Sequence, residues 1–184
     1  MYQGCNKKAL SSQNSIAEGF YELLKEKEYS KITASEICKK SGVSRQTFYS
    51  LFSSKENIVA YILSKEYAFN PTKECNCCGR PTLEELSKGF SSFIIQKGNF
   101  IELLEKNNII YLMQETLYCS FNGCMNTEQN KSTPNDITDS VEIDFIASGL
   151  TTIAKHYVKN QQSITCSELE EMIYTLFSGK YFGS

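Results

Sequence analysis

The sequence predicts an all-α fold of about nine helices, and two observations carry the prediction. Apolar residues recur at the spacing of a helix face along almost the whole chain, whereas the alternation typical of strands is nearly absent. Three Ser/Thr-x-x-Glu segments also stand at the start of apolar runs, where such a pair caps a helix N-terminus. We therefore expect a small three-helix domain followed by a larger helical bundle.

The first three helices are defined by two starting signals and one apolar face. The second helix begins with the capping box of Thr33 and Glu36, and Ser44 is the expected N-cap of the third helix. The first helix should run to about Lys27, and its apolar face consists of Ile16, Phe20, Leu23 and Leu24.

A fourth helix is expected to connect the two domains. Ser53 and Glu56 form its capping box, and its apolar residues continue as far as Phe69. Pro71 should end it, since proline disfavours α geometry in the preceding residue, and the segment 71–81 has no helical periodicity. The predicted divisions are an N-terminal domain at residues 1–53, a connecting helix at 54–70 and a C-terminal domain at 71–184.

The C-terminal domain is predicted to hold five helices. Helical spacing of apolar residues resumes after the break and is interrupted by a polar loop at residues 122–136. The last helix starts at the third capping box, formed by Ser167 and Glu170. The expected helices span residues 83–96, 100–104, 109–121, 138–160 and 167–181.

The charge of the chain is unevenly divided between the two domains. The net charge is −2, which by itself argues against a polyanionic partner. Residues 1–70, however, hold ten Lys and Arg against seven Asp and Glu, whereas residues 71–184 hold nine against fourteen. A basic head on an acidic body is the distribution expected when the head alone contacts phosphate.

The N-terminal domain has the spacing of a helix-turn-helix. Its second and third helices are joined by the short segment 40–43, in which Gly42 can adopt the positive φ that a steep helix crossing needs. In this motif the later helix lies in the major groove of DNA. Phe48 and Phe52 should pack inward, which leaves an outward face made of Ser44, Arg45, Gln46, Thr47, Tyr49 and Ser50.

The outward face has the chemistry of a DNA reader. Arginine pairs with guanine and glutamine with adenine, so Arg45 and Gln46 are the candidates for base contacts. Hydroxyl and ammonium groups near helix starts suit phosphate, and here they belong to Thr33, Thr47, Tyr49 and Lys55. The alternative interpretation is a solvated polar face on a helix that the two phenylalanines anchor.

Four stretches of the N-terminal domain carry a resemblance that is in order and without gaps: FYELL at 20–24, YSKITASEI at 29–37, SGVSRQTFY at 41–49 and FSSKE at 52–56. Together they resemble the DNA-binding domain of the TetR/AcrR family of transcriptional regulators, over about residues 10–60. The resemblance implies that Thr33 contacts the DNA backbone and that Tyr49 and Lys55 contact phosphates. The same resemblance implies that the DNA bases are contacted by Arg45, Gln46 and Thr47. Ala34 replaces the Val of many members, a change in core size.

The resemblance also implies a role for the C-terminal domain, because family members dimerise and hold a small-molecule pocket there. The last two helices would form a homodimer interface and so present two reading heads to a palindromic operator in double-stranded DNA. The alternative is that these helices bury their apolar faces within one subunit. An effector of unknown structure would bind near Phe93, Phe100, Tyr111, Gln114, Glu115 and Tyr118, although aromatic residues at this spacing also suit a plain core.

Two of the eight cysteines, Cys75 and Cys78, have the C-x2-C spacing of a metal knuckle. They supply only half of a tetrahedral zinc site, which Cys119 and Cys124 would complete. We expect no bound metal and no cofactor, because unmetallated thiols in a variable loop are the simpler interpretation. Zinc binding and redox sensing are the alternatives.

These features predict a one-component transcriptional regulator, a repressor released by a small-molecule, metal or redox signal. The alternatives are an activator of the same family and a helical sensor or adaptor whose helix-turn-helix no longer binds specific DNA. No catalytic motif supports an enzyme, and the single histidine, His156, lies in mid-helix. No apolar run reaches the roughly 18 residues that span a membrane, and no secretory signal begins the chain, so we expect a cytoplasmic protein.

Overall fold

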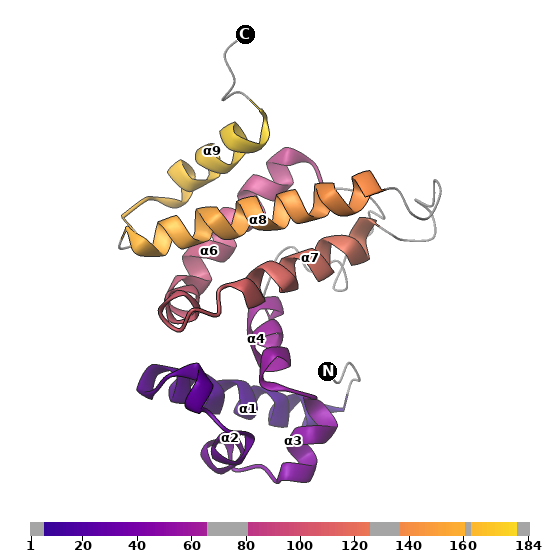
Figure 1. The fold of residues 1–184 in the computed structure, drawn as a ribbon, viewed down its shortest axis with the longest axis vertical. Helices are drawn as coiled ribbons and strands as arrows, with labels where there is room; N and C mark the ends of the chain where they lie inside the picture. Colours follow the sequence, from indigo (N-terminus) through magenta and orange to yellow (C-terminus); the bar gives the residue numbers. More distant parts are fainter. Residues whose placement is uncertain (1–5, 66–80, 126–136, 161–162, 180–184) are drawn as a thin grey trace. The chain divides into compact units, whose positions relative to one another are not determined.

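The computed structural model (Figure 1) describes residues 6–65, 81–125, 137–160 and 163–179. Within these ranges the chain forms eight α-helices, one short 3-10 helix and no strand, which confirms the predicted all-α fold class. The chain divides into two compact units, Met1–Lys65 and Glu66–Ser184. None of the helices in the described ranges combines the length and apolar character needed to cross a membrane.

Five helical segments make up the first unit: α1 (Lys7–Glu26), the 3-10 helix η1 (Tyr29–Lys31), α2 (Ala34–Ser41), α3 (Arg45–Leu51) and α4 (Lys55–Ser64). α1 packs against the other three α-helices, and α2 also packs against α3. The core of the unit includes six side chains that are at most 1% exposed: Ile16, Phe20, Ile37, Phe48, Phe52 and Ile58.

Local signals account for the starts of α2 and α3. The Thr33 hydroxyl oxygen accepts from the Glu36 amide and the Glu36 carboxylate accepts from the Thr33 amide, which confirms the predicted capping box. Ser44 caps α3 by accepting from the Thr47 amide at 3.0 Å. Between the two helices Gly42 has a φ of 69°, a left-handed conformation that costs a residue with a side chain about 1–2 kcal/mol.

The start of α4 differs from the prediction. Its N-cap is Ser54, which makes no side-chain capping bond, so the predicted capping box of Ser53 and Glu56 is wrong. The carboxylate of Glu56 instead accepts a hydrogen bond from the phenol of Tyr29, at 2.6 Å. Tyr29 lies 27 residues away in the sequence, and the same carboxylate also has a side-chain hydrogen bond with the neighbouring Ser54.

The end of α4 also differs from the prediction. The helix ends at Ser64 rather than near Phe69, because Lys65 turns to an extended conformation with a ψ of 124°. Phe69 itself lies outside the described residues. Pro71 could only set a limit beyond which the helix does not continue, and a helix is free to end before such a limit.

The second unit contains α6 (Leu83–Lys106), α7 (Tyr111–Met125), α8 (Ile137–Lys159) and α9 (Cys166–Phe177). α8 lies beside α7 and also packs on α6, whose other neighbour is α9 (Figure 1). The side chains that are fully buried among these helices include Phe90, Ile94, Ile101, Leu104, Met113 and Leu150.

α6 and α7 are both longer than predicted. The two helices expected at 83–96 and 100–104 are one continuous helix, with Gly98 buried inside it. A glycine in a helix interior costs only about 1 kcal/mol, which the packing of a long buried helix can offset. α7 continues to Met125, so the first residues of the predicted polar loop are helical.

α9 uses a different capping box from the predicted pair of Ser167 and Glu170. Thr165 accepts from the Glu168 amide at 3.3 Å, and the Glu168 carboxylate accepts from the Thr165 amide at 2.8 Å. Both pairs have the same Ser/Thr-x-x-Glu spacing, so the local pattern does not distinguish them.

Candidate nucleic-acid interface

Six of the seven predicted DNA contacts, all but Tyr49, lie at the N-terminal ends of three helices in the first unit. Thr33 is the N-cap of α2, Ser44 is the N-cap of α3, and Lys55 is the first residue of α4. The partial positive charge at the N-termini of α2 and α4 favours phosphate there. The first turn of α3 holds Arg45, Gln46 and Thr47.

α3 has one buried and one exposed face, as the spacing of its residues predicts. Phe48 and Phe52 are buried in the core, with 1% and 0% of their surface exposed. Arg45 and Gln46 are exposed, and so is Tyr49, at 61%, with its ring edge-on to Phe48 at 5.2 Å between centroids. The helix is therefore anchored by apolar packing and presents polar side chains to the outside.

Arg45 reaches back to α2 in this structure. Its Nη2 atom donates a hydrogen bond to Oγ of Ser35 at 2.5 Å. A guanidinium has five N–H donors in a planar fork, so the bond to Ser35 leaves others that can meet a guanine edge. Ser35 is not among the predicted site residues, because a contact between residues ten positions apart on two helices has no local signature in the sequence.

The hydroxyl groups of Thr33, Ser44 and Thr47 already take part in the helix caps. Oγ1 of Thr33 donates to the carboxylate of Glu36 at 2.8 Å. The hydroxyl oxygens of Ser44 and Thr47 lie 2.9 Å apart, and one donates to the other. A phosphate oxygen would compete with these caps for a hydroxyl proton, and the DNA contacts of the three residues stay predictions.

Glu36 has a pKa that the structure lowers from 4.5 to about 2. The main cause is a hydrogen bond from the Lys27 side chain, and the amide and hydroxyl of Thr33 add to it. All three donors favour the charged form of the carboxyl group. The carboxylate therefore joins the end of α1 to the start of α2 as long as it stays ionised.

Glu36→Gln is expected to lower the free energy of unfolding at neutral pH and to matter less in acid. Glutamine keeps the capping geometry but loses the charge. Because the pKa of Glu36 is lower in the folded state, its charge stabilises the fold fully above about pH 4.5. This stabilisation is lost as the pH falls through about 2. Urea unfolding of both proteins at about pH 7 and about pH 2 checks this, with Glu18→Gln on α1 as a control for one lost charge. A difference of the same size at both pH values would contradict it.

Lys55 is tied to the segment that precedes α2. Its Nζ atom donates to the carbonyl oxygens of Tyr29 and Ile32, both at 2.9 Å, and lies 4.1 Å from the centroid of the Tyr29 ring. An ammonium group carries three N–H donors, so a third can still be offered to a phosphate. The predicted phosphate contact of Lys55 is compatible with this geometry and stays a prediction.

The six residues predicted to line an effector pocket lie on α6 and α7. Phe93 and Phe100 are buried on α6, and Gln114 on α7 donates to the hydroxyl of Ser148 on α8 at 2.9 Å. On α7 the remaining three are Tyr111 and Glu115, which are exposed, and Tyr118, which is half-buried. Their role in binding an effector stays a prediction.

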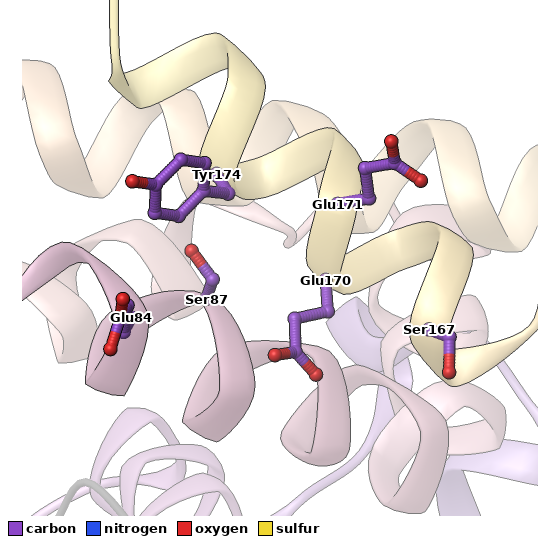
Figure 2. Close-up of a pocket in the computed structure, with 6 residues that line it drawn as sticks. All are labelled: Glu84, Ser87, Ser167, Glu170, Glu171 and Tyr174. Atoms are coloured by element: carbon purple, nitrogen blue, oxygen red, sulfur yellow. The ribbon is translucent and has the colours of Figure 1, made fainter.

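An open pocket of about 320 Å³ lies between α6 and α9 (Figure 2). None of the residues predicted to bind an effector lines it. Figure 2 shows residues from two facing helices, with the side chain of Glu171 directed away from Ser87 and Tyr174. The full lining consists of Glu84 and Ser87 of α6 and of Ser167, Glu170, Glu171 and Tyr174 of α9.

The cysteines of the alternative zinc site fall largely outside the described residues. Cys75 and Cys78 are not described, and Cys124 lies in the last turn of α7 without a described side chain. Cys119 is exposed on the same helix. Over the described ranges no group of three or more His, Cys, Asp or Glu is arranged to hold a metal ion. The zinc alternative is therefore untested.

Known proteins match parts of the chain in sequence. The family described as "Bacterial regulatory proteins, tetR family" matches residues 18–62, a range that contains every predicted DNA contact. The HTH-type dhaKLM operon transcriptional activator DhaS of Lactococcus lactis subsp. lactis (strain IL1403) is 32% identical over 62 residues. That alignment covers 34% of this chain and 33% of the relative, so it spans about a third of the relative's length.

Solved structures match most of the chain in fold. One is the dihydroxyacetone kinase operon activator DhaS, with a TM-score of 0.54 at 18% identity. The matched region covers 94% of this chain and 98% of the DhaS chain. Another, a TetR transcriptional regulator from Streptococcus agalactiae 2603V, has a TM-score of 0.56 at 20% identity, with 93% and 96% covered. At such identities the likeness is one of fold.

Proposed function

We propose that this chain is a DNA-binding regulator of the TetR family, which binds a palindromic operator as a homodimer in the cytoplasm and represses the genes beside it. The observation that carries the proposal is α3, where buried Phe48 and Phe52 hold Arg45 and Gln46 on an exposed face. The family match over residues 18–62 covers this helix and the N-termini of its neighbours.

A second copy of the chain would bind through α8 and α9. Both helices expose large apolar side chains: Val141 at 59% and Phe145 at 60% on α8, and Met172 at 38% and Leu176 at 41% on α9. Phe145 meets Phe177 edge-on, with ring centroids 6.2 Å apart, and so links the two helices. Exposed apolar side chains on adjoining helices are typical of interaction surfaces, and a two-fold dimer would bury the same surface on each copy.

An effector would act by shifting a population of conformations. It would favour a conformation of the dimer in which the two copies of α3 no longer match the spacing of the operator half-sites. A small molecule is the proposed effector, and we place its site in the second unit.

Activation is a second candidate for the direction of control. The relative from Lactococcus lactis carries the name of a transcriptional activator, although the alignment spans about a third of its length. A reporter gene placed behind the operator distinguishes the two directions. Expression that rises when the regulator is deleted supports repression, and expression that falls supports activation.

Selection from a random library of double-stranded DNA, with the full-length protein as bait, tests the proposal. The expected result is a palindromic motif whose half-sites are centred one helical turn, about 10–10.5 base pairs, or a multiple of it apart. Light scattering should show a dimer in solution and two subunits on each operator. A motif without an inverted repeat would contradict the homodimer. No enrichment of any sequence would favour the sensor or adaptor alternative.

A further inference from the structure

Tyr29, in the short helix η1, contacts the first turn of α4 through three different groups. Its backbone carbonyl accepts from Nζ of Lys55 at 2.9 Å, and its ring lies beneath the same ammonium, 4.1 Å from centroid to Nζ. Its phenol donates to Oε1 of Glu56 at 2.6 Å. Behind it, the ring meets Phe20 of the core edge-on at 6.2 Å. One side chain thus joins the core, Lys55 and Glu56.

These contacts leave the ammonium of Lys55 little freedom. Two of its three N–H donors go to the carbonyls of Tyr29 and Ile32, and the face of an aromatic ring attracts the cation from a further direction. A free lysine side chain samples many rotamers, and ordering it on binding weakens the complex. Here the ordering has already taken place before any DNA is bound.

The held ammonium also joins two helix starts that are predicted to face phosphate. The carbonyl of Ile32 belongs to the residue before Thr33, the N-cap of α2, while Lys55 begins α4. Glu56 keeps the phenol of Tyr29 in place, and the hydrogen bond from that phenol is the main cause of the lowered pKa of the Glu56 carboxyl. The carboxylate is therefore charged, and able to accept this bond, at neutral pH.

We propose that Tyr29 is a positioning residue for DNA binding, which holds the ammonium of Lys55 ready to donate its third N–H to a phosphate of the operator. This inference rests on the proposed function, because it needs an operator that Lys55 contacts. Tyr29 itself touches no DNA in this scheme and acts through Lys55.

A double-mutant cycle in the full-length protein tests the inference, with dissociation constants for the selected operator measured at several salt concentrations. Lys55→Met should weaken binding and reduce the slope of log K against log salt by about 0.9, the loss of one phosphate contact. Tyr29→Leu removes the ring face beside Nζ but keeps the backbone carbonyls, and should weaken binding roughly two- to tenfold, at most the effect of freeing one long side chain. In the Lys55→Met background, Tyr29→Leu should have no further effect on affinity.

Tyr29→Phe is the matched control, because it keeps the ring and the backbone carbonyl beside Lys55 and removes only the phenol oxygen. It should retain most of the affinity that Tyr29→Leu loses. Thermal unfolding of every variant shows whether the unit is folded. If Tyr29→Leu is not folded, Tyr29→Met carries the same test, since its flexible side chain fills the space beside Phe20 without offering a ring face.

Two outcomes would overturn the inference while leaving the proposed function standing. One is a Tyr29→Leu effect of equal size with and without Lys55, because a merely structural residue would act in both backgrounds. The other is a Lys55→Met variant with unchanged affinity and salt slope. If the wild-type protein binds no specific DNA, the proposed function itself fails, and that result is separate from the cycle.

Discussion

Replacing Arg45 and Gln46 with alanine is expected to remove most of the protein's discrimination between its operator and other DNA. Both side chains are exposed on α3, and each can make a bidentate contact with a base edge. Such a contact is worth about 1–3 kcal/mol of discrimination, so each single substitution should reduce the preference roughly 5- to 150-fold. Dissociation constants for the operator and for a scrambled duplex, measured at one salt concentration, check this.

The fold should survive the double substitution, since neither side chain contributes to the core of the first unit. Lys55→Met provides the contrast, because loss of a phosphate contact should weaken binding to the operator and to the scrambled duplex by similar factors. If the double alanine variant binds both duplexes as the wild type does, α3 is not the reading helix. A wild-type protein that does not discriminate between the two duplexes would instead fit the sensor or adaptor alternative.

Phe52→Ala should cost the first unit about 3–5 kcal/mol of unfolding free energy, the usual range for a large buried side chain. Phe52 is 0% exposed and packs against Phe48 of α3, at 6.4 Å between ring centroids, and against Tyr61 of α4, at 5.5 Å. A unit of this size has little stability to spare, because small domains bury a smaller share of their surface. The variant should therefore lose both its unfolding transition and its DNA binding.

Tyr49→Phe is the matched control for that loss. The phenol of Tyr49 is on an exposed side chain of the same helix, and phenylalanine keeps the edge-on contact with Phe48. This variant should keep the wild-type unfolding midpoint in urea and lose only the affinity that one phosphate contact supplies. A Phe52→Ala protein that unfolds at the wild-type urea concentration would show that α3 is not held by the packing described above.

The short-range features of the reading head could be predicted from the sequence. The capping box of Thr33 and Glu36, the cap at Ser44 and the left-handed Gly42 all depend on residues three or four positions apart. So does the division of α3 into a buried and an exposed face. Each of these features was predicted correctly, because near neighbours in the chain are also near neighbours in a helix.

The predictions that were wrong concern features that depend on contacts with distant parts of the chain. Glu56 was assigned to a local box with Ser53, and the structure gives its carboxylate to Tyr29 instead. The pairs Thr165 with Glu168 and Ser167 with Glu170 have the same spacing, so no local rule could choose between them. The two predicted helices around Gly98 are one, because burial of α6 in the bundle offsets the low helix propensity of glycine.

The sequence by itself therefore determined the helical class, the turn at Gly42 and the polar face on which Arg45 and Gln46 lie. Only the tertiary structure decided which groups the cationic side chains contact. Arg45 donates to Ser35, and Lys55 contacts the ring and the carbonyl of Tyr29. The physical reason is the range of the interactions. Helix caps and faces are set by hydrogen bonds and side chains within one turn, whereas a cation held between carbonyls 23 and 26 residues away exists only after the helices have packed.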